Sequence, residues 1–80
     1  MEKISLLAGE TKSLVDFIDA RKASVTIEGT ARVSDDGTEP NADCGHKITD
    51  NSLILLNRSE IKNFRVHAIT DSSVQASYIQ

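Results

Sequence analysis

Several residue types that usually reinforce a small fold are scarce in this chain of 80 residues. It has a single cysteine, Cys44, so no disulfide can form within it. Tryptophan is absent, and the three aromatic residues are Phe17, Phe64 and Tyr78, which predicts an aliphatic core. Domains of this length bury a modest share of their surface and often gain stability by oligomerisation. We therefore expect one domain, residues 1–80, that forms a homo-oligomer.

The sequence also lacks a basic cluster and a long apolar run. The net charge is −3, and the Lys and Arg residues are scattered among acidic ones. Modules that bind nucleic acid usually gather basic residues on one face. The longest apolar run, residues 53–56, is far shorter than the roughly 20 residues needed to cross a bilayer as a helix. We expect neither nucleic acid nor a membrane as a partner.

The residues that are present favour strands. Val, Ile and Thr together supply 19 of the 80 residues, and these side chains fit a pleated sheet. Apolar and polar residues alternate in residues 2–8, 24–33, 64–70 and 74–79. The apolar run at residues 53–56 is typical of a strand buried on both faces, with one face against a neighbouring subunit. The pattern predicts an all-β fold, a small β-sandwich or barrel of about six to seven short antiparallel strands.

Some local features predict more specific structure. Residues 11–18 fit a strand with a bend near Asp16 or a single helical turn. Gly29 interrupts the alternation of residues 24–33, which indicates a bulge or a close approach of another backbone. Residues 49–52 and 57–60 are expected to be turns.

The spacing near the end of the chain predicts a β-hairpin. About three turn residues separate the alternating run at residues 64–70 from the run at residues 74–78. Two such runs joined by three to five residues are typical of paired antiparallel strands.

The middle of the chain is the longest stretch without periodicity. Residues 38–47 contain the only proline and few residues to bury, so residues 35–46 are expected to form an exposed loop. Loops of this length often contact partners. The candidate contact residues are Asp35, Asp36, Glu39, Asp43 and His46.

No metal or other cofactor is expected in this loop. Cys44-Gly45-His46 does not match the paired spacing of structural zinc ligands, of which there are usually four. The loop carboxylates resemble a calcium loop in composition only, because the closing Glu of an EF-hand is missing. We also expect no enzyme activity, because so thin a domain has little depth to exclude water around a catalytic pair.

The larger apolar residues of the second half are candidates for packing and for assembly with other subunits. They are Leu53, Leu55, Phe64, Val66 and Tyr78.

The chain also resembles small structural proteins of tailed bacteriophages. The segments concerned are ISLLAGET (residues 4–11), VTIEGTA (25–31), IKNFRV (61–66) and VQASY (74–78). Similar segments occur in β-rich virion proteins of the head-decoration, head-fibre-base or spike type. The resemblance implies a symmetric homo-oligomer, with a trimer expected, that contacts other virion proteins such as the major capsid protein. It implies a place in the virion, after assembly in the host cytoplasm.

The leading interpretation is a viral structural protein that attaches to or builds a phage particle surface. One alternative is a phage-encoded inhibitor that binds a host defence protein or a signalling molecule through the acidic loop. Another is a carbohydrate-binding or adhesion module, although such modules usually present an aromatic platform and this chain has no tryptophan.

Overall fold

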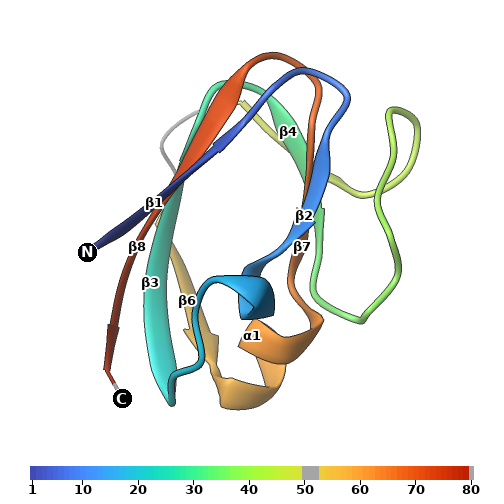
Figure 1. Cartoon of the computed structure of the whole chain (residues 1–80). Helices are drawn as coiled ribbons and strands as arrows, with labels where there is room; N and C mark the ends of the chain where they lie inside the picture. The colour runs from blue at the N-terminus through green and yellow to red at the C-terminus, as the bar shows by residue number, and fades with distance from the viewer. Residues whose placement is uncertain (50–52, 80) are drawn as a thin grey trace.

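The computed structural model describes residues 1–49 and 53–79. Within them the chain forms eight strands, one turn of 3-10 helix (η1) and one short α-helix (α1), shown in Figure 1. The elements in chain order are β1 (Glu2–Leu6), β2 (Thr11–Ser13), η1 (Leu14–Asp16), β3 (Lys22–Glu28), β4 (Ala31–Ser34), β5 (His46–Ile48), β6 (Ile54–Asn57), α1 (Arg58–Asn63), β7 (Arg65–Ala68) and β8 (Ser72–Ile79).

The strands form two antiparallel sheets of four. Sheet A has the order β1-β8-β3-β6, and sheet B has the order β2-β7-β4-β5. The first strand pairs with the eighth, the second with the seventh, the third with the sixth and the fourth with the fifth. This nesting of antiparallel pairs is that of an eight-stranded jelly roll. The predicted all-β fold is confirmed, and of the two predicted forms, sandwich or barrel, the structure is a sandwich, with eight strands instead of six or seven.

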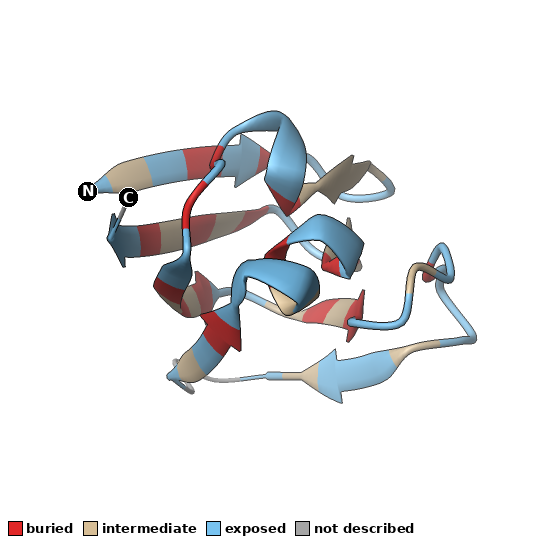
Figure 2. Ribbon diagram, turned by 90° about the horizontal axis from the view of Figure 1, so that it is seen from below, coloured by how far each residue is buried: buried red, intermediate tan, exposed pale blue. Residues whose placement is uncertain are grey.

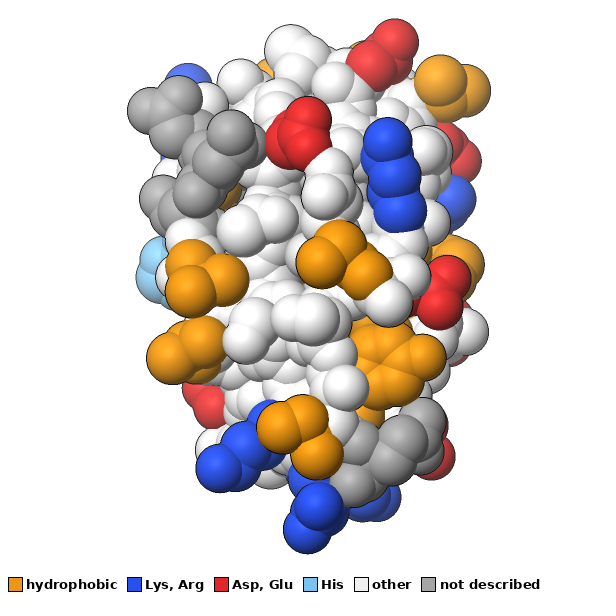
Figure 3. Space-filling view, turned by 90° about the vertical axis from the view of Figure 1, so that its left-hand side faces the viewer, with side chains coloured by type: hydrophobic (Ala, Val, Ile, Leu, Met, Phe, Trp, Pro, Cys, Tyr) orange, Lys and Arg blue, Asp and Glu red, His pale blue; other side chains and the backbone are white. Residues whose placement is uncertain are grey.

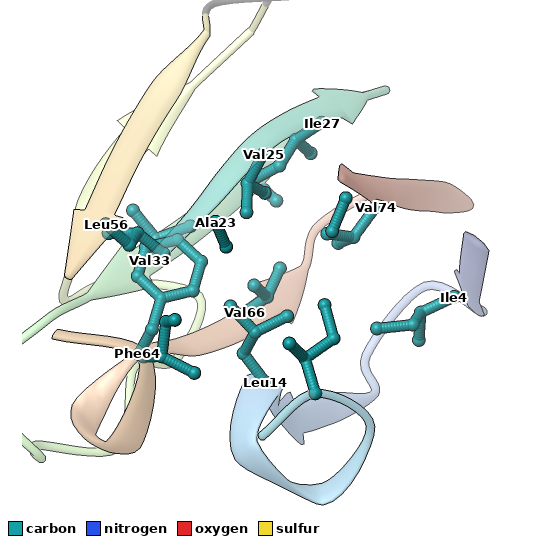
Figure 4. Close-up of a cluster of buried hydrophobic side chains, with 14 of the residues drawn as sticks. Ile4, Leu14, Ala23, Val25, Ile27, Val33, Leu56, Phe64, Val66 and Val74 are labelled. Carbon is teal, nitrogen blue, oxygen red and sulfur yellow. The ribbon is translucent and has the colours of Figure 1, made fainter. Parts of the chain in front are cut away.

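The core lies between the two sheets and is aliphatic, as the sequence predicted. Alternate residues of β3 are buried, Ala23, Val25 and Ile27, while Ser24 and Thr26 face outward. The same alternation runs through β7 and β8, and it gives the striped burial pattern of Figure 2. Figure 4 shows side chains of both sheets pointing toward one another, with Phe64, the aromatic residue of the core, at one end of the cluster beside Val33 and Leu56.

The alternating run at residues 24–33 forms two strands, because the chain bends at Gly29 and changes sheet. β3 belongs to sheet A and β4 to sheet B. Gly29 has φ +98°, and a Cβ atom there would lie 2.6 Å from the Ser72 side-chain oxygen and 2.8 Å from the Asp71 carbonyl. Of the two predictions for this glycine, the close approach of another backbone is therefore confirmed.

The predicted hairpin of residues 64–78 is wrong. β7 pairs with β2 and β4 in sheet B, whereas β8 pairs with β1 and β3 in sheet A. The connecting residues cross from one sheet to the other, and Ile69 and Thr70 donate backbone hydrogen bonds to Thr30. Alternation is the same for two strands that face one core from opposite sheets, so it could not exclude this arrangement.

Residues 57–60 begin a helix and do not form the predicted turn. Asn57 caps α1: its side chain accepts a hydrogen bond from the Glu60 amide, at 2.9 Å, and the Glu60 side chain accepts one from the Asn57 amide, at 3.0 Å. This reciprocal pair is a capping box. Ile61 in the next position is buried against the core, so the helix closes one end of the sandwich.

The ambiguous residues 11–18 contain both predicted structures in succession. The strand β2 is followed by the single turn η1, whose Leu14 is buried. Leu14 donates its backbone hydrogen bond to the Phe64 carbonyl, which ties η1 to the end of α1. Of the predicted turn at residues 49–52, residues 50–52 lie outside the described part of the chain.

Candidate functional site

The five apolar residues predicted for packing and assembly divide into two groups. Phe64 and Val66 are 2% and 3% exposed, so they belong to the core and cannot contact a partner. Their strand alternation marked them as buried but could not tell a core from an interface. Leu53, Leu55 and Tyr78 are 63%, 69% and 39% exposed, and they stay candidates for assembly.

The outward positions of Leu53 and Leu55 follow from the pleat of β6. Leu56 is buried and Ile54 is half-buried against the core, so the alternate positions, Leu53 and Leu55, point away from it. Residues 53–56 were predicted to be buried on both faces. Within one chain they are buried only on the face toward the core. β6 is the last strand of sheet A and pairs only with β3 among the described residues. The structure thus places two large apolar side chains at an open sheet edge.

The outer face of sheet A has a shallow groove beside this edge. It has a volume of about 470 Å³. In register across the sheet, Ser24 of β3 lies between Leu55 of β6 and Ser77 of β8, and Lys22 lies opposite Ile79. The small serines leave a hollow between the larger apolar residues. Figure 3 shows this face, where hydrophobic side chains lie around a largely uncharged centre.

Ile79 is a further residue of this face that the assembly prediction omitted. It is 59% exposed and lines the groove with Leu55. The alternation of β8 contained the signal, because Ile79 falls on the polar side of the strand with Gln75 and Ser77. A large apolar residue at an outward position is the feature that should have been noticed.

The acidic loop is exposed, but its backbone is firmly held. The side chains of Asp35, Asp36, Glu39 and Asp43 are exposed. Beneath them, Arg32 of β4 donates hydrogen bonds to the carbonyls of Ala42, at 3.0 Å, and Gly45, at 2.9 Å. Pro40 is buried, and the backbones of Asn41 and Cys44 pair with each other. The loop therefore exposes four carboxylates on a backbone that hydrogen bonds hold in place. His46 is exposed as predicted, but it begins the strand β5 and is not part of the loop.

Local hydrogen bonds perturb one of these carboxylates. The Thr38 backbone amide donates to Asp36 Oδ1 at 2.9 Å, and the Thr38 hydroxyl also contributes. These hydrogen bonds, together with the nearby His46, lower the pKa of Asp36 below its ordinary value of 3.8. Asp36 therefore stays ionised into more acidic solutions than a free aspartate.

The cysteine and histidine of this region line a depression of about 440 Å³ with Asp35 and Asp36. Their arrangement does not form a metal site: in residues 1–49 and 53–79, no group of three or more Cys, His, Asp or Glu residues could hold an ion. Cys44 is exposed.

The outer face of sheet B brings together basic residues that are far apart in the sequence. Arg32 lies opposite Lys47 on one side and opposite His67 on the other. His67 Nδ1 is in turn 2.7 Å from the Thr11 hydroxyl. Arg32 donates to the Ala42 and Gly45 carbonyls, so its guanidinium holds the loop backbone and is not directed at a ligand.

No helix in the described part of the chain is long and apolar enough to cross a membrane.

Comparison with known proteins found no matching family model, no matching curated protein and no matching solved structure.

Proposed function

We propose that this protein is a structural component of a bacteriophage particle, a self-associating jelly-roll module that attaches to or builds the particle surface. The observation that carries the proposal is the outer face of sheet A, where Leu53, Leu55 and Ile79 are exposed. Leu55 and Ile79 also line the groove, together with the small residues Ser24 and Ser77. Exposed apolar groups gathered in one region mark sites of protein interaction.

The fold supports the same proposal by analogy. Jelly rolls are used by viral capsid domains, and also by lectins and cupins, so the fold by itself does not choose among them. The resemblance of four segments to phage virion proteins favours the first of these groups. A subunit of 80 residues with a thin core gains stability when a neighbour covers its exposed leucines.

Purified particles provide the direct test. Mass spectrometry of phage particles banded in a density gradient should find this chain at a fixed copy number relative to the major capsid protein. A matched sample from host cells that express the chain without the phage controls for contamination. Particles that lack the protein would overturn the proposal.

A second candidate function rests on the acidic loop. Four exposed carboxylates on an anchored backbone suit a protein that blocks a basic surface of a host defence protein. In a pull-down from host lysate, the wild-type chain should recover a host protein at one-to-one stoichiometry. A variant with D35N, D36N, E39Q and D43N should lose it. Equal recovery by both chains would exclude the loop as the contact.

A further inference from the structure

We propose that β6 pairs antiparallel with β6 of a second copy of this chain and so joins two A sheets into one continuous sheet. The inference rests on the proposed function in that it specifies how the module associates with itself. It starts from the four strands that form the sheet edges, β1 and β6 in sheet A and β2 and β5 in sheet B.

Three of these edges have features that discourage pairing with another chain. Short length and charged side chains are the usual protections of an edge strand. β1 begins with Glu2 and Lys3. β2 has three residues and contains Lys12, whose ammonium group donates to the Ser5 carbonyl across the gap between the sheets. β5 also has three residues, and it contains His46 and Lys47.

β6 is also short, at four residues, but it is the one edge of the four without a charged residue. Its four residues are Ile, Leu, Leu and Asn, with Leu53 just before them, so residues 53–57 contain no charge and no proline. The described part of the chain supplies β6 with a partner on one side only, which leaves half of its backbone groups facing outward. An edge of this kind is a template for another strand.

In a second copy of the chain, β6 fits this edge better than the other edge strands do. Antiparallel pairing centred on Leu55 covers the whole uncharged segment, and it sets Leu55 opposite Leu55 and Leu53 opposite Asn57 of the other copy. The contact is twofold and closes on itself, which limits its growth to a dimer. Pairing of β6 with β1 of another copy would instead place apolar residues opposite Glu2 and Lys3.

The pairing also enlarges the exposed apolar area on the outer face of sheet A. Leu53 and Leu55 of both copies would lie side by side on the outer face of the joined sheet, next to each groove. Cross-strand apolar pairs of this kind stabilise a sheet. A twofold contact predicts a dimer or an assembly built of dimers, in contrast to the trimer implied by the phage resemblance.

Disulfide trapping in the full-length chain tests the register. The background is C44S, which removes the only cysteine. Opposite residues of antiparallel strands have Cα atoms about 4.5–5.5 Å apart, which suits a disulfide. We expect L55C to form a disulfide-linked dimer on mild oxidation. The matched control, T26C, is on the outward side of the inner strand β3 and should stay monomeric on a denaturing gel. Trapping of T26C but not L55C would overturn edge pairing in favour of face-to-face packing.

Sedimentation equilibrium tests the edge itself. L55K places two ammonium groups opposite each other at the twofold axis and should weaken dimerisation on the order of 100-fold. Leu7 follows β1 and is 66% exposed, close to the 69% of Leu55, so L7K is the matched control and should leave the dimer intact. A wild-type chain that stays monomeric at submillimolar concentration would overturn the proposal. Equal weakening by L7K would overturn it too, because it indicates a contact between β6 and β1.

These outcomes are separable from the proposed function. Incorporation into phage particles is measured on particles, whereas pairing through β6 is measured on the purified chain. A dimer that is absent from particles leaves the pairing intact and removes the virion role. A particle protein whose L55K variant is incorporated at an unchanged copy number retains the virion role without this contact.

Discussion

The two ends of the sandwich are closed in different ways. At the upper end in Figure 1, three connections meet through hydrogen bonds: Gly9 donates to the Ala68 carbonyl, Ile69 donates to Thr30, and the Ala8 amide donates to Asp71 Oδ1. At the lower end, η1 and α1 close the core with apolar side chains, among them Leu14 and Ile61. One end therefore depends on backbone geometry and glycine, and the other on packing.

The difference explains why the sequence indicated the connections at the upper end more clearly than the helices at the lower end. At the upper end, the sequence indicated a close approach at Gly29 and turn residues between the last two runs, although it assigned the strands that they join to one hairpin. The lower end is made by two helices of one or two turns. The first was one of two predictions for residues 11–18, and the second was predicted to be a turn, because so short a helix shows little of a helical period. Such helices form because the core accepts one or two of their residues, which is a tertiary property.

The largest expected effect comes from removing the aromatic residue at the packed end. F64A should destabilise the fold by about 3–5 kcal/mol, because Phe64 is 2% exposed and its loss leaves a cavity. That is a large share of the stability of a chain this size, and urea denaturation should show it. If F64A does not fold, F64L should fold with a loss of about 1–2 kcal/mol. A loss below that range for F64A would mean that the packed end contributes little.

At the hydrogen-bonded end, replacing Gly29 by alanine should destabilise the fold more than replacing Gly9. G29A should cost about 3 kcal/mol, because φ is +98° and the new Cβ would meet the Ser72 side chain and the Asp71 carbonyl. Gly9 has φ +91° with nothing within 4 Å of a Cβ atom, so G9A should cost only about 1–2 kcal/mol. Thermal unfolding of the two variants measures the difference. Equal losses would show that backbone strain alone, without the close approach, governs this end.

A smaller effect is expected at the helix cap of the packed end. N57A removes the acceptor for the Glu60 amide and should cost about 1 kcal/mol. S59A changes an exposed residue of the same helix and should leave the urea midpoint unchanged. Amide hydrogen exchange should locate the change in residues 58–63. Unaltered exchange there would indicate that packing of Ile61 holds the helix without its cap.

The smallest effect concerns the acidic loop, which belongs to neither end. Because the fold lowers the pKa of Asp36, the ionised form is favoured in the folded chain. The resulting stabilisation is present above the ordinary value of 3.8 and is lost as pH falls through the lower folded pKa. NMR titration should place the midpoint of the Asp36 carboxyl below 3.8, with the Thr38 amide shifting in parallel. In T38P, which removes that amide, the midpoint should return toward 3.8. An unchanged midpoint would assign the effect to the Asp36 backbone amide and His46, the causes that T38P leaves in place.

Sequence reasoning located part of the candidate site. The outward position of Leu55 was open to prediction because Leu56 and Ile54 had to face the core together. The burial of Phe64 and Val66 was equally visible in the alternation. Their predicted role in packing is confirmed, but their predicted role in assembly was wrong, because a pattern records that a residue is buried and not what buries it. The capping box of Asn57 and Glu60 was visible in the sequence, and it would have replaced the predicted turn with a helix start.

The sequence by itself determined that this chain is all-β, with an aliphatic core and an exposed acidic loop. It could do so because β-branched residues, alternation and turn residues act locally. The assignment of strands to sheets was decided only by the tertiary structure. Both sheets face one core, so β7 and β8 have the same alternation whether they pair or stand opposite each other. The bend at Gly29 depends on Asp71 and Ser72, more than 40 residues along the chain, and the groove beside Leu55 exists only where β3, β6 and β8 lie side by side.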